Sequence, residues 1–313
     1  MSTRELGLGL QSNKRPGDYA ALAVQAEDAG FDVVTVFNDL FFQPALPALL
    51  EIAHATERVR VGPSCLNPFT LHPVEIAGQV AALDLASDGR AFLGLAAGAW
   101  LDRLELPRDR PQRPAQRIRE TWAIVELLLA GDDSGFDGEV FHLAPGSVLA
   151  YEPLRPRVPL LVGTWSPLLT AFAAEQGAEL KLGGCANPAM VTLTRERLGA
   201  AETRIVVGAV FVVDEDDAAA RAQARLEVAL YLPVVAGLDP TVDVDPRTPA
   251  AEIPDDVLDL FAFAGEPARI AEHAERLFAA GASRVEFGTP HGIDERRGVE
   301  LLGSQVVPLL REP

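Results

Sequence analysis

Polar side chains stand directly after most of the strands that the sequence pattern predicts, where a hydroxyl, amide, thiol, imidazole or carboxylate could reach a ligand. In chain order they are Gln11, Ser12, Asn13, Asn38, Asp39, Ser64, Cys65, Asn67, His72, Trp100, Asp102, Thr164, Trp165, Ser166, Cys185, Asn187, Thr289 and His291. The set holds no Ser/His/Asp arrangement, no H-E-x-x-H motif and no Cys/His cluster with zinc-ligand spacing, so we expect no metal site. A site without its own strong acid, base or metal indicates a bound organic cofactor that carries the difficult step.

The segment from Arg58 to Trp100 shows how the chain would position these residues. Val59 and Val61 begin an apolar strand, residues 74–85 repeat apolar side chains at helical spacing, and residues 91–96 form a second apolar strand. An apolar strand, a crossover helix and another apolar strand imply parallel pairing with both faces of the sheet covered. The two loops that follow the strands therefore open on the same side, and chemistry should collect there.

The same alternation runs through the chain. The predicted strands are Leu6–Leu10, Phe31–Phe37, Val59–Val61, Ala91–Ala96, Pro159–Thr164, Leu180–Leu182, Arg204–Val213 and Arg284–Gly288. Eight strands alternating with about eight helices predict an α/β fold, a single (β/α)8 TIM barrel over residues 1–313, rather than a doubly wound sheet. No G-x-G-x-x-G follows the first strand, which argues against a Rossmann domain.

Three segments read as additions to that alternation. Residues 131–143 favour an excursion with a short hairpin. Residues 100–114 and 237–254 would be loop insertions at the C-terminal face of the barrel. The second is rich in Pro, Asp and Thr, and we interpret it as a surface loop or a mobile lid, with disorder as the alternative.

Composition limits the partners. The 313 residues carry a formal net charge of -18, which disfavours nucleic acid and anionic membranes because both would repel the protein. The sequence has no apolar signal segment and no run of roughly 18 apolar residues, so we expect a soluble, cytoplasmic protein that acts on a small molecule. Its two cysteines are too few for a disulfide framework and should be reduced.

Residues 67–98 resemble the luciferase-like superfamily of flavin and deazaflavin oxidoreductases. Members place an N-P-x-x-x-H-P turn before the third helix and an L-D-x-x-S-x-G-R-x-x-L-G-x-G-x-G run around the fourth strand. The matching residues here are Asn67, Pro68, His72, Pro73, Leu83, Asp84, Ser87, Gly89, Arg90, Leu93, Gly94 and Gly98. The endings GTPHG at 288–292 and GVELLG at 298–303 are similar to the coenzyme F420-dependent branch, and within it to the methylenetetrahydromethanopterin reductases.

The resemblance implies roles for many of the polar residues. It implies a non-prolyl cis peptide bond between Ser64 and Cys65 behind the deazaflavin ring, with an ordinary trans loop as the alternative. It implies that the segment 163–166 binds the cofactor phosphate at a helix N-terminus, where Ser166 could also be a plain N-cap. The cofactor-binding residues implied are Asn38, Ser64, Cys65, Asn67, His72, Gly98, Gly163, Thr164, Trp165, Ser166, Cys185 and Asn187, and the substrate-contacting residues are Gln11 and Trp100.

Three of these roles have structural alternatives. His72 could simply orient the turn before Pro73, and Cys185 could be a small buried side chain. Trp100 could cover the substrate face of the ring or only pack its loop. The residues alone leave these alternatives open.

The sequence also departs from the family pattern. The pair that follows the second strand, often Asp-His in the family, is Asn38-Asp39 here. The reductase branch carries a glutamate in the first strand and an aspartate after the fourth-strand glycines, where this chain has Gly9 and Ala99. Asp39 is therefore our first candidate for a proton donor and His291 the second, with an exposed Asp39 without a role as the alternative.

The sequence thus favours an F420-dependent oxidoreductase. It would transfer a hydride between reduced deazaflavin and a small imine, iminium or activated C=C, with an alcohol less favoured. One alternative is an FMN-dependent luciferase-like monooxygenase, and another is a non-catalytic cofactor-binding protein. Because family members are commonly dimers, we also expect a homodimer.

Overall fold

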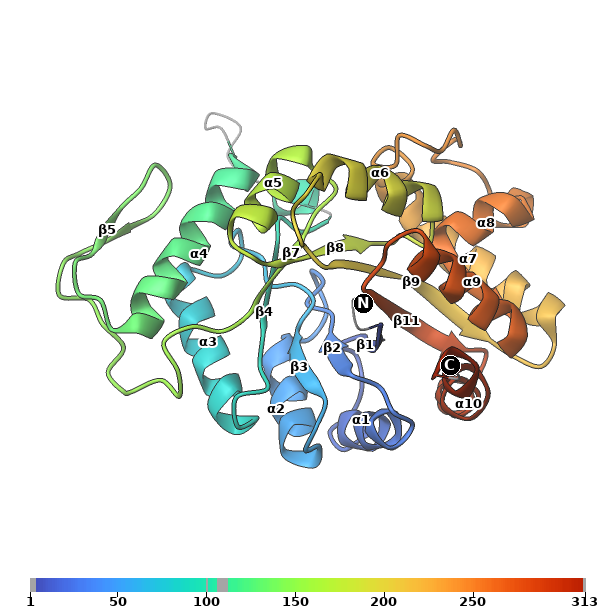
Figure 1. The fold of residues 1–313 in the computed structure, drawn as a ribbon, viewed down its shortest axis with the longest axis horizontal. Helices are drawn as coiled ribbons and strands as arrows, with labels where there is room; N and C mark the ends of the chain where they lie inside the picture. Colours follow the sequence, from blue (N-terminus) through green and yellow to red (C-terminus); the bar gives the residue numbers. More distant parts are fainter. Residues whose placement is uncertain (1–3, 100, 106–111, 312–313) are drawn as a thin grey trace.

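The structure, a computed structural model, describes residues 4–99, 101–105 and 112–311. Within these ranges eight parallel strands form a nearly closed barrel in the order β3-β2-β1-β11-β9-β8-β7-β4, surrounded by helices (Figure 1). The edge strands β3 and β4 approach each other through two bridges, Val61 to Ala91 and Leu66 to Leu95. The predicted (β/α)8 barrel is confirmed.

The barrel strands coincide with the apolar runs of the sequence because parallel strands are buried on both faces. They are β1 (Glu5–Leu10), β2 (Val33–Val36), β3 (Arg60–Pro63), β4 (Leu93–Ala96), β7 (Leu160–Gly163), β8 (Glu179–Gly183), β9 (Ile205–Val213) and β11 (Arg284–Gly292). A further strand, β10 (Ala262–Gly265), pairs with the C-terminal half of β9 and is missing from the eight predicted strands. The predicted hairpin is β5 (Phe136–Asp137) with β6 (His142–Leu143).

The outer helices follow the strands as in a crossover barrel. They are α1 (Asp18–Asp28), α2 (Ala45–Ala55), α3 (Pro73–Ala86), α4 (Pro114–Ala130), α5 (Pro167–Glu175), α6 (Pro188–Leu198), α9 (Pro267–Ala279) and α10 (Glu295–Leu301), the last continued by the π-helix η3 (Leu302–Val306) and α11 (Val307–Arg311). Gly30 and Gly281 follow α1 and α9 with φ of 91° and 109°. This left-handed conformation suits glycine, so both predicted helix ends are confirmed.

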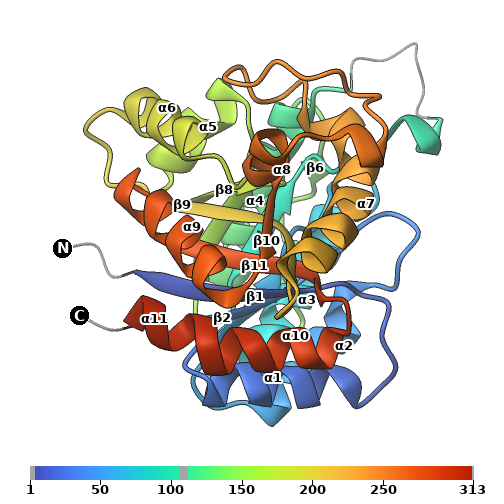
Figure 2. The same cartoon turned by 90° about the vertical axis from the view of Figure 1, so that its right-hand side faces the viewer.

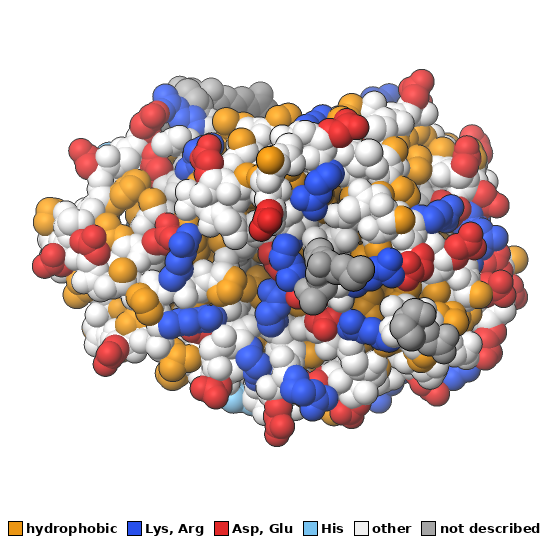
Figure 3. Space-filling view, viewed as in Figure 1, with side chains coloured by type: hydrophobic (Ala, Val, Ile, Leu, Met, Phe, Trp, Pro, Cys, Tyr) orange, Lys and Arg blue, Asp and Glu red, His pale blue; other side chains and the backbone are white. Residues whose placement is uncertain are grey.

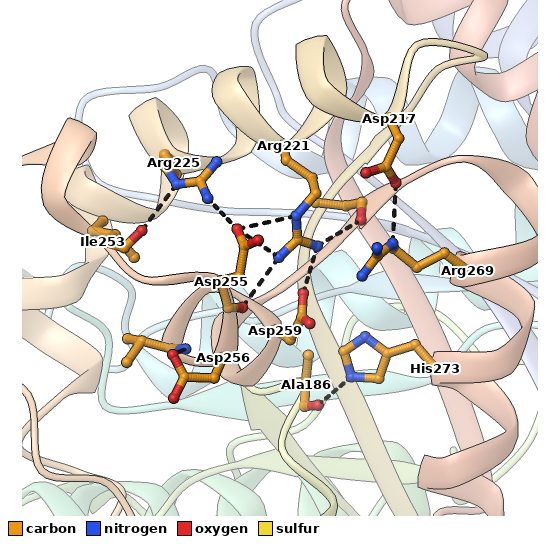
Figure 4. Close-up of polar contacts among 12 residues, drawn as sticks. Ala186, Asp217, Arg221, Arg225, Ile253, Asp255, Asp256, Asp259, Arg269 and His273 are labelled. Carbon is orange, nitrogen blue, oxygen red and sulfur yellow. Dashed lines mark hydrogen bonds and ion pairs between the residues drawn. The ribbon is translucent and has the colours of Figure 1, made fainter.

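The long helix α7 (Asp217–Val235) lies across the side of the barrel opposite the two chain ends (Figure 2). It packs with α8 (Asp255–Phe261) and β10 around a second apolar cluster. Arg221 of α7 is only 4% exposed and bonds Asp259 at 2.7 Å and Asp255 at 3.0 Å (Figure 4). Arg269 of α9 pairs with Asp217 at 3.0 Å. These ion pairs fix α7 against α8 and α9.

Charged side chains fill the N-terminal end of the barrel interior, and we term them the lower charged layer. The carboxylate of Glu179 lies 2.8 Å from Arg284 and 3.2 Å from Arg60. Glu5 lies 2.6 Å from Arg60 and 2.7 Å from Arg204. Arg284 is fully buried.

On the outer surface near both chain ends, acidic and basic side chains are interspersed (Figure 3).

Candidate active site

A cavity of about 560 Å³ opens at the C-terminal ends of the barrel strands. The ends of β2, β3, β4, β7, β8, β9 and β11 form its floor and walls, and α7 covers it with Val228, Tyr231, Val234 and Val235. The wall is mostly apolar. A cavity of this volume and character is the usual size for a cofactor or drug-sized ligand.

Most of the cofactor-binding residues predicted from the sequence meet at this cavity. They are Asn38, Ser64, Cys65, Asn67, Gly98, Gly163, Thr164, Trp165 and Ser166, and the candidate proton donor Asp39 lies with them. These residues come from four different loops, so the barrel topology, rather than nearness in sequence, brings them together. Trp100 lies outside the described residues.

The wall beside β3 and β7 is built by close backbone packing. The peptide bond between Ser64 and Cys65 is cis, as the resemblance implies. A Cβ atom on Gly163 would lie 3.0 Å from the Cys65 Sγ, and one on Gly98 would lie 2.2 Å from the Asn67 side-chain nitrogen. Burial raises the pKa of the Cys65 thiol to about 11, so the thiol is neutral near pH 7. This wall therefore presents an uncharged surface to the cavity.

The start of α5 provides polar groups at one end of the cavity. The Thr164 hydroxyl accepts a hydrogen bond from the backbone N–H of Ser166 at 3.0 Å, and the Ser166 side chain makes no capping bond. The Trp165 indole donates to the carbonyl of Gly183 at 3.1 Å and holds the loop against β8. The first N–H groups of a helix lack intrahelical partners and attract anions.

Five other predicted site residues do not line the cavity: Gln11, His72, Cys185, Asn187 and His291. His72 is the N-cap of α3, where Nδ1 accepts from the Val74 N–H at 3.3 Å, which is the turn-orienting alternative. His291 is fully buried, with Nε2 donating to the Gly9 carbonyl at 2.9 Å. Its Nδ1 lies 3.3 Å from Glu295. Both histidines are thus occupied in structural contacts.

Cys185 and Asn187 lie in the loop after β8. Cys185 is fully buried, and burial raises the pKa of its thiol to about 12. The Asn187 side chain caps α6 and donates to Asp239 and Thr241, at 2.8 Å each. Asp239 is 1% exposed, so this contact anchors the segment 237–254 beside the cavity.

Asp39 lies at the cavity beside Gln11. The Gln11 side-chain N–H donates to the Asp39 Oδ2 at 3.3 Å. Burial raises the pKa of Asp39, against the opposing effects of this hydrogen bond and of the Lys181 charge. Burial and the nearby Asp39 charge also raise the pKa of Tyr231 to about 12. An aspartate that holds its proton more tightly than usual is suited to donate it.

A buried ion pair that the sequence interpretation missed forms the cavity floor. Lys181 of β8 pairs with Glu286 of β11, and Lys181 also donates to the Ser64 hydroxyl at 2.6 Å. The Thr35 hydroxyl donates to Glu286 Oε1 at 3.1 Å. We term Thr35, Ser64, Lys181 and Glu286 the upper charged layer. A charged residue in the middle of an apolar strand is the signal that could have indicated it, because such residues need a buried partner.

Gly9 stands where the reductase branch carries a glutamate, and this position lies next to the upper charged layer. A Cβ atom on Gly9 would lie 2.5 Å from the Phe37 ring and 3.2 Å from Glu286 Oε1. The side chains of Phe37 and Glu286 thus occupy the space beside Gly9. A carboxylate is present at the cavity floor, supplied by β11 rather than by β1.

These features suit a flat organic cofactor with a phosphate group. A neutral, closely packed wall can lie against a ring, and the start of α5 can receive an anion. A Cβ atom on Gly183, which also lines the cavity, would meet no atom within 4 Å, so there is open space at this point. Fold and site together define a parallel α/β barrel with a cofactor-sized cavity at its C-terminal face.

Residues 1–284 match the sequence profile of the luciferase-like monooxygenase family. The chain belongs to this family, and the resemblance seen in residues 67–98 is confirmed.

Individual relatives match over nearly the whole chain. The 5,10-methylenetetrahydromethanopterin reductase of Archaeoglobus fulgidus is 27% identical over 91% of this chain and 93% of its own length. The F420-dependent glucose-6-phosphate dehydrogenase of Kineococcus radiotolerans is 28% identical over 95% of this chain and 94% of its own. The structure of the coenzyme F420-dependent tetrahydromethanopterin reductase from Methanopyrus kandleri superposes with a TM-score of 0.86 at 24% identity, covering 99% of this chain and 100% of that one. At 24% identity, this structural match shows the similarity of the fold alone.

Proposed function

We propose that the protein is an F420-dependent oxidoreductase that transfers a hydride between reduced deazaflavin and a small organic substrate. We favour an imine, an iminium ion or an activated C=C as the substrate, over an alcohol. The observation that carries the proposal is the cofactor-sized cavity with a neutral wall and a helix N-terminus. The F420-dependent dehydrogenase that aligns with 95% of the chain supports the choice of deazaflavin.

Two groups of residues would hold the cofactor. The wall at Ser64, Cys65 and Gly163 would lie against the ring, and Thr164 with the free Ser166 hydroxyl would bind the phosphate at the start of α5. When bound, reduced F420 supplies a hydride. Helix α7 covers the cavity and would exclude water from the reacting groups.

Asp39 is the residue we propose as the proton donor. Gln11 donates to Oδ2, which leaves Oδ1 to carry the proton. Burial raises the pKa of Asp39, so the carboxyl stays protonated to a higher pH than an exposed aspartate. His291 remains the second candidate, although its ring nitrogens contact Gly9 and Glu295 rather than the cavity.

A fluorescence titration with F420 and with FMN tests the proposal. We expect saturable binding of F420, and oxidation of reduced F420 by at least one member of a panel of imines, activated alkenes and alcohols. Tight binding of FMN without binding of F420 would contradict the proposal and favour a flavin monooxygenase. Binding of F420 without turnover on any substrate would favour a non-catalytic cofactor-binding protein.

The variant Gly183→Leu locates the binding site. Its side chain would project into the open space of the cavity, so we expect F420 binding to be lost while the thermal melting temperature stays close to that of the wild type. Unchanged F420 binding in this variant would place the cofactor elsewhere.

The protein's assembly and location extend the proposal. Within the described part of the chain, every helix is too short or too polar to span a lipid bilayer. We propose a homodimer that works in the cytoplasm, as expected from the sequence. Sedimentation velocity tests the dimer, and a single monomeric species at micromolar concentration would contradict it.

A further inference from the structure

Glu286 has one oxygen that is engaged and one that is not. Its Oε1 receives both the Lys181 ammonium and the Thr35 hydroxyl. Its Oε2 is buried and has no hydrogen-bond partner among the described residues. Buried carboxylate oxygens nearly always have a partner, so an unpartnered one in a residue that lines a cavity indicates a ligand that supplies the missing donor.

A glycine in β9, the strand between β8 and β11, leaves room for Lys181 and Glu286 to contact each other. Lys181 on β8 and Glu286 on β11 flank β9, whose Gly208 lies beside both. A Cβ atom on Gly208 would lie 3.2 Å from the Lys181 side chain and 3.5 Å from the Glu286 Cβ. Because residue 208 has no side chain, the pair sits at the cavity floor rather than being covered.

This end of the cavity holds two carboxyl groups and one cation. Among the described residues that line it, the carboxyl groups are those of Asp39 and Glu286, and the cation is Lys181. Lys181 pairs directly with Glu286 and acts on Asp39 only through its charge. Carboxyl oxygens accept hydrogen bonds, so this end favours a cation or a strong hydrogen-bond donor over an anion.

The cofactor wall and the acidic end are adjoining parts of the cavity. The wall comes from β3, β4 and β7, and the acidic end from β2, β11 and α7. Lys181 touches both, through Ser64 on the wall and Glu286 at the acidic end. With the wall assigned to the deazaflavin, the acidic end is left for the substrate.

We propose that Glu286 Oε2 accepts a hydrogen bond from a protonated nitrogen of the substrate, so that the substrate class is a small iminium ion. This inference rests on the proposed function, in which reduced F420 supplies the hydride. The iminium carbon gains the hydride and forms a C–H bond, the C=N π pair moves to nitrogen, and a neutral amine results while the deazaflavin loses two electrons. The nitrogen needs no further proton in the hydride step, because the proton it carries is the one that Asp39 supplies to the neutral imine beforehand.

Binding of small amines to the protein loaded with oxidised F420 tests this assignment by calorimetry, without turnover. The probes are pyrrolidine, piperidine and benzylamine, each matched with a neutral counterpart: cyclopentanone, cyclohexanone and benzyl alcohol. We expect at least one amine to bind the wild type more tightly than its counterpart. In Glu286→Gln its affinity should fall about tenfold or more, because a charged hydrogen bond is lost. Binding of the neutral counterpart should stay unchanged.

Two controls separate this inference from the proposed function. F420 should bind Glu286→Gln as it binds the wild type. Glu227 is a carboxylate of α7 whose charge acts on Tyr231, but Glu227 itself does not line the cavity. Glu227→Gln should therefore leave amine affinity unchanged. If Glu286→Gln does not fold, the double variant Lys181→Met/Glu286→Leu removes the same carboxylate and should lose the same amine affinity.

Three results would overturn the inference. They are no amine binding to the F420-loaded wild type, equal amine affinity in the wild type and the variant, and loss of F420 binding in the variant, which would assign Glu286 to the cofactor. Failure of F420 to bind the wild type would instead contradict the proposed function itself.

Discussion

The barrel interior holds two charged layers that use the same two strands in opposite ways. Strand β8 contributes Glu179 to the lower layer and Lys181 to the upper one, while β11 contributes Arg284 and Glu286. Residues two apart on a strand point to the same face, so each strand places both of its charges inside the barrel. Of these two strands, β8 supplies a carboxylate to the lower layer and β11 supplies the carboxylate of the upper layer.

The two layers differ in how far their carboxylates are paired. Both oxygens of Glu179 have an arginine nitrogen within 3.5 Å, although the N–H groups of Arg284 are not aligned for hydrogen bonds. In Glu286 only Oε1 is engaged. The lower layer lies away from the cavity, whereas Ser64, Lys181 and Glu286 of the upper layer line it. We infer that the lower layer stabilises the fold and that the upper layer serves the site.

Glu179→Gln should produce the largest loss of stability. It leaves the buried Arg284 without its nearest carboxylate, and breaking a buried ion pair costs about 3–5 kcal/mol. Burial raises the pKa of Glu179, but the neighbouring Arg284, Arg60 and Arg204 outweigh it and lower the pKa. Its stabilisation is therefore present above the pKa of the unfolded chain and is lost as pH falls. In urea unfolding, the difference in the free energy of unfolding between wild type and variant should be large at pH 7 and smaller in acid. A difference under 1 kcal/mol at pH 7 would remove the distinction between the layers.

Lys181→Met should destabilise the protein less. It leaves the Glu286 carboxylate with the Thr35 hydroxyl as its remaining described partner, but at the edge of a cavity rather than in the packed interior. We expect a loss of about 1–3 kcal/mol in urea unfolding at pH 7. A loss larger than that of Glu179→Gln would mean that the upper layer is the structural one.

Asp39→Asn should have the smallest effect on stability and a clear effect on turnover. Burial raises the pKa of Asp39, so its contribution to stability is greatest at low pH and is lost as pH rises through that pKa. At pH 7 the variant should be as stable as the wild type or slightly more so. We expect wild-type turnover to decline as pH rises, and we expect the variant to lose that decline and to turn over at least about 100-fold more slowly. A wild-type pH profile retained in full would show that Asp39 donates no proton.

The fold could be predicted from the sequence because its signals are local. Apolar runs, alternating helices and the glycines after α1 and α9 each specify an element without reference to the rest of the chain. The extra strand β10 could not be predicted in the same way, because it is short and is defined by its pairing with β9. The cis bond between Ser64 and Cys65 was predicted from the family resemblance alone.

The site was only partly predictable, because its chemistry depends on which strands face each other across the barrel. Residues in the loops after strands could be assigned to the cavity, as Ser64 and Thr164 show. Lys181 and Glu286 lie inside strands and 105 positions apart, so only the closed barrel brings them together. The interpretation of His291 relied on its loop position, and its buried contact with Gly9 could not be read from sequence.

The free energy of unfolding of Lys181→Met/Glu286→Leu tests the distinction between the layers most directly. Replacing a buried ion pair by apolar side chains of similar volume is often neutral or stabilising. If the upper layer exists for the site, the double variant should unfold within about 1 kcal/mol of the wild type, or at higher urea, and yet fail to oxidise reduced F420 with any substrate. A loss of several kcal/mol, or turnover at the wild-type rate, would contradict the account.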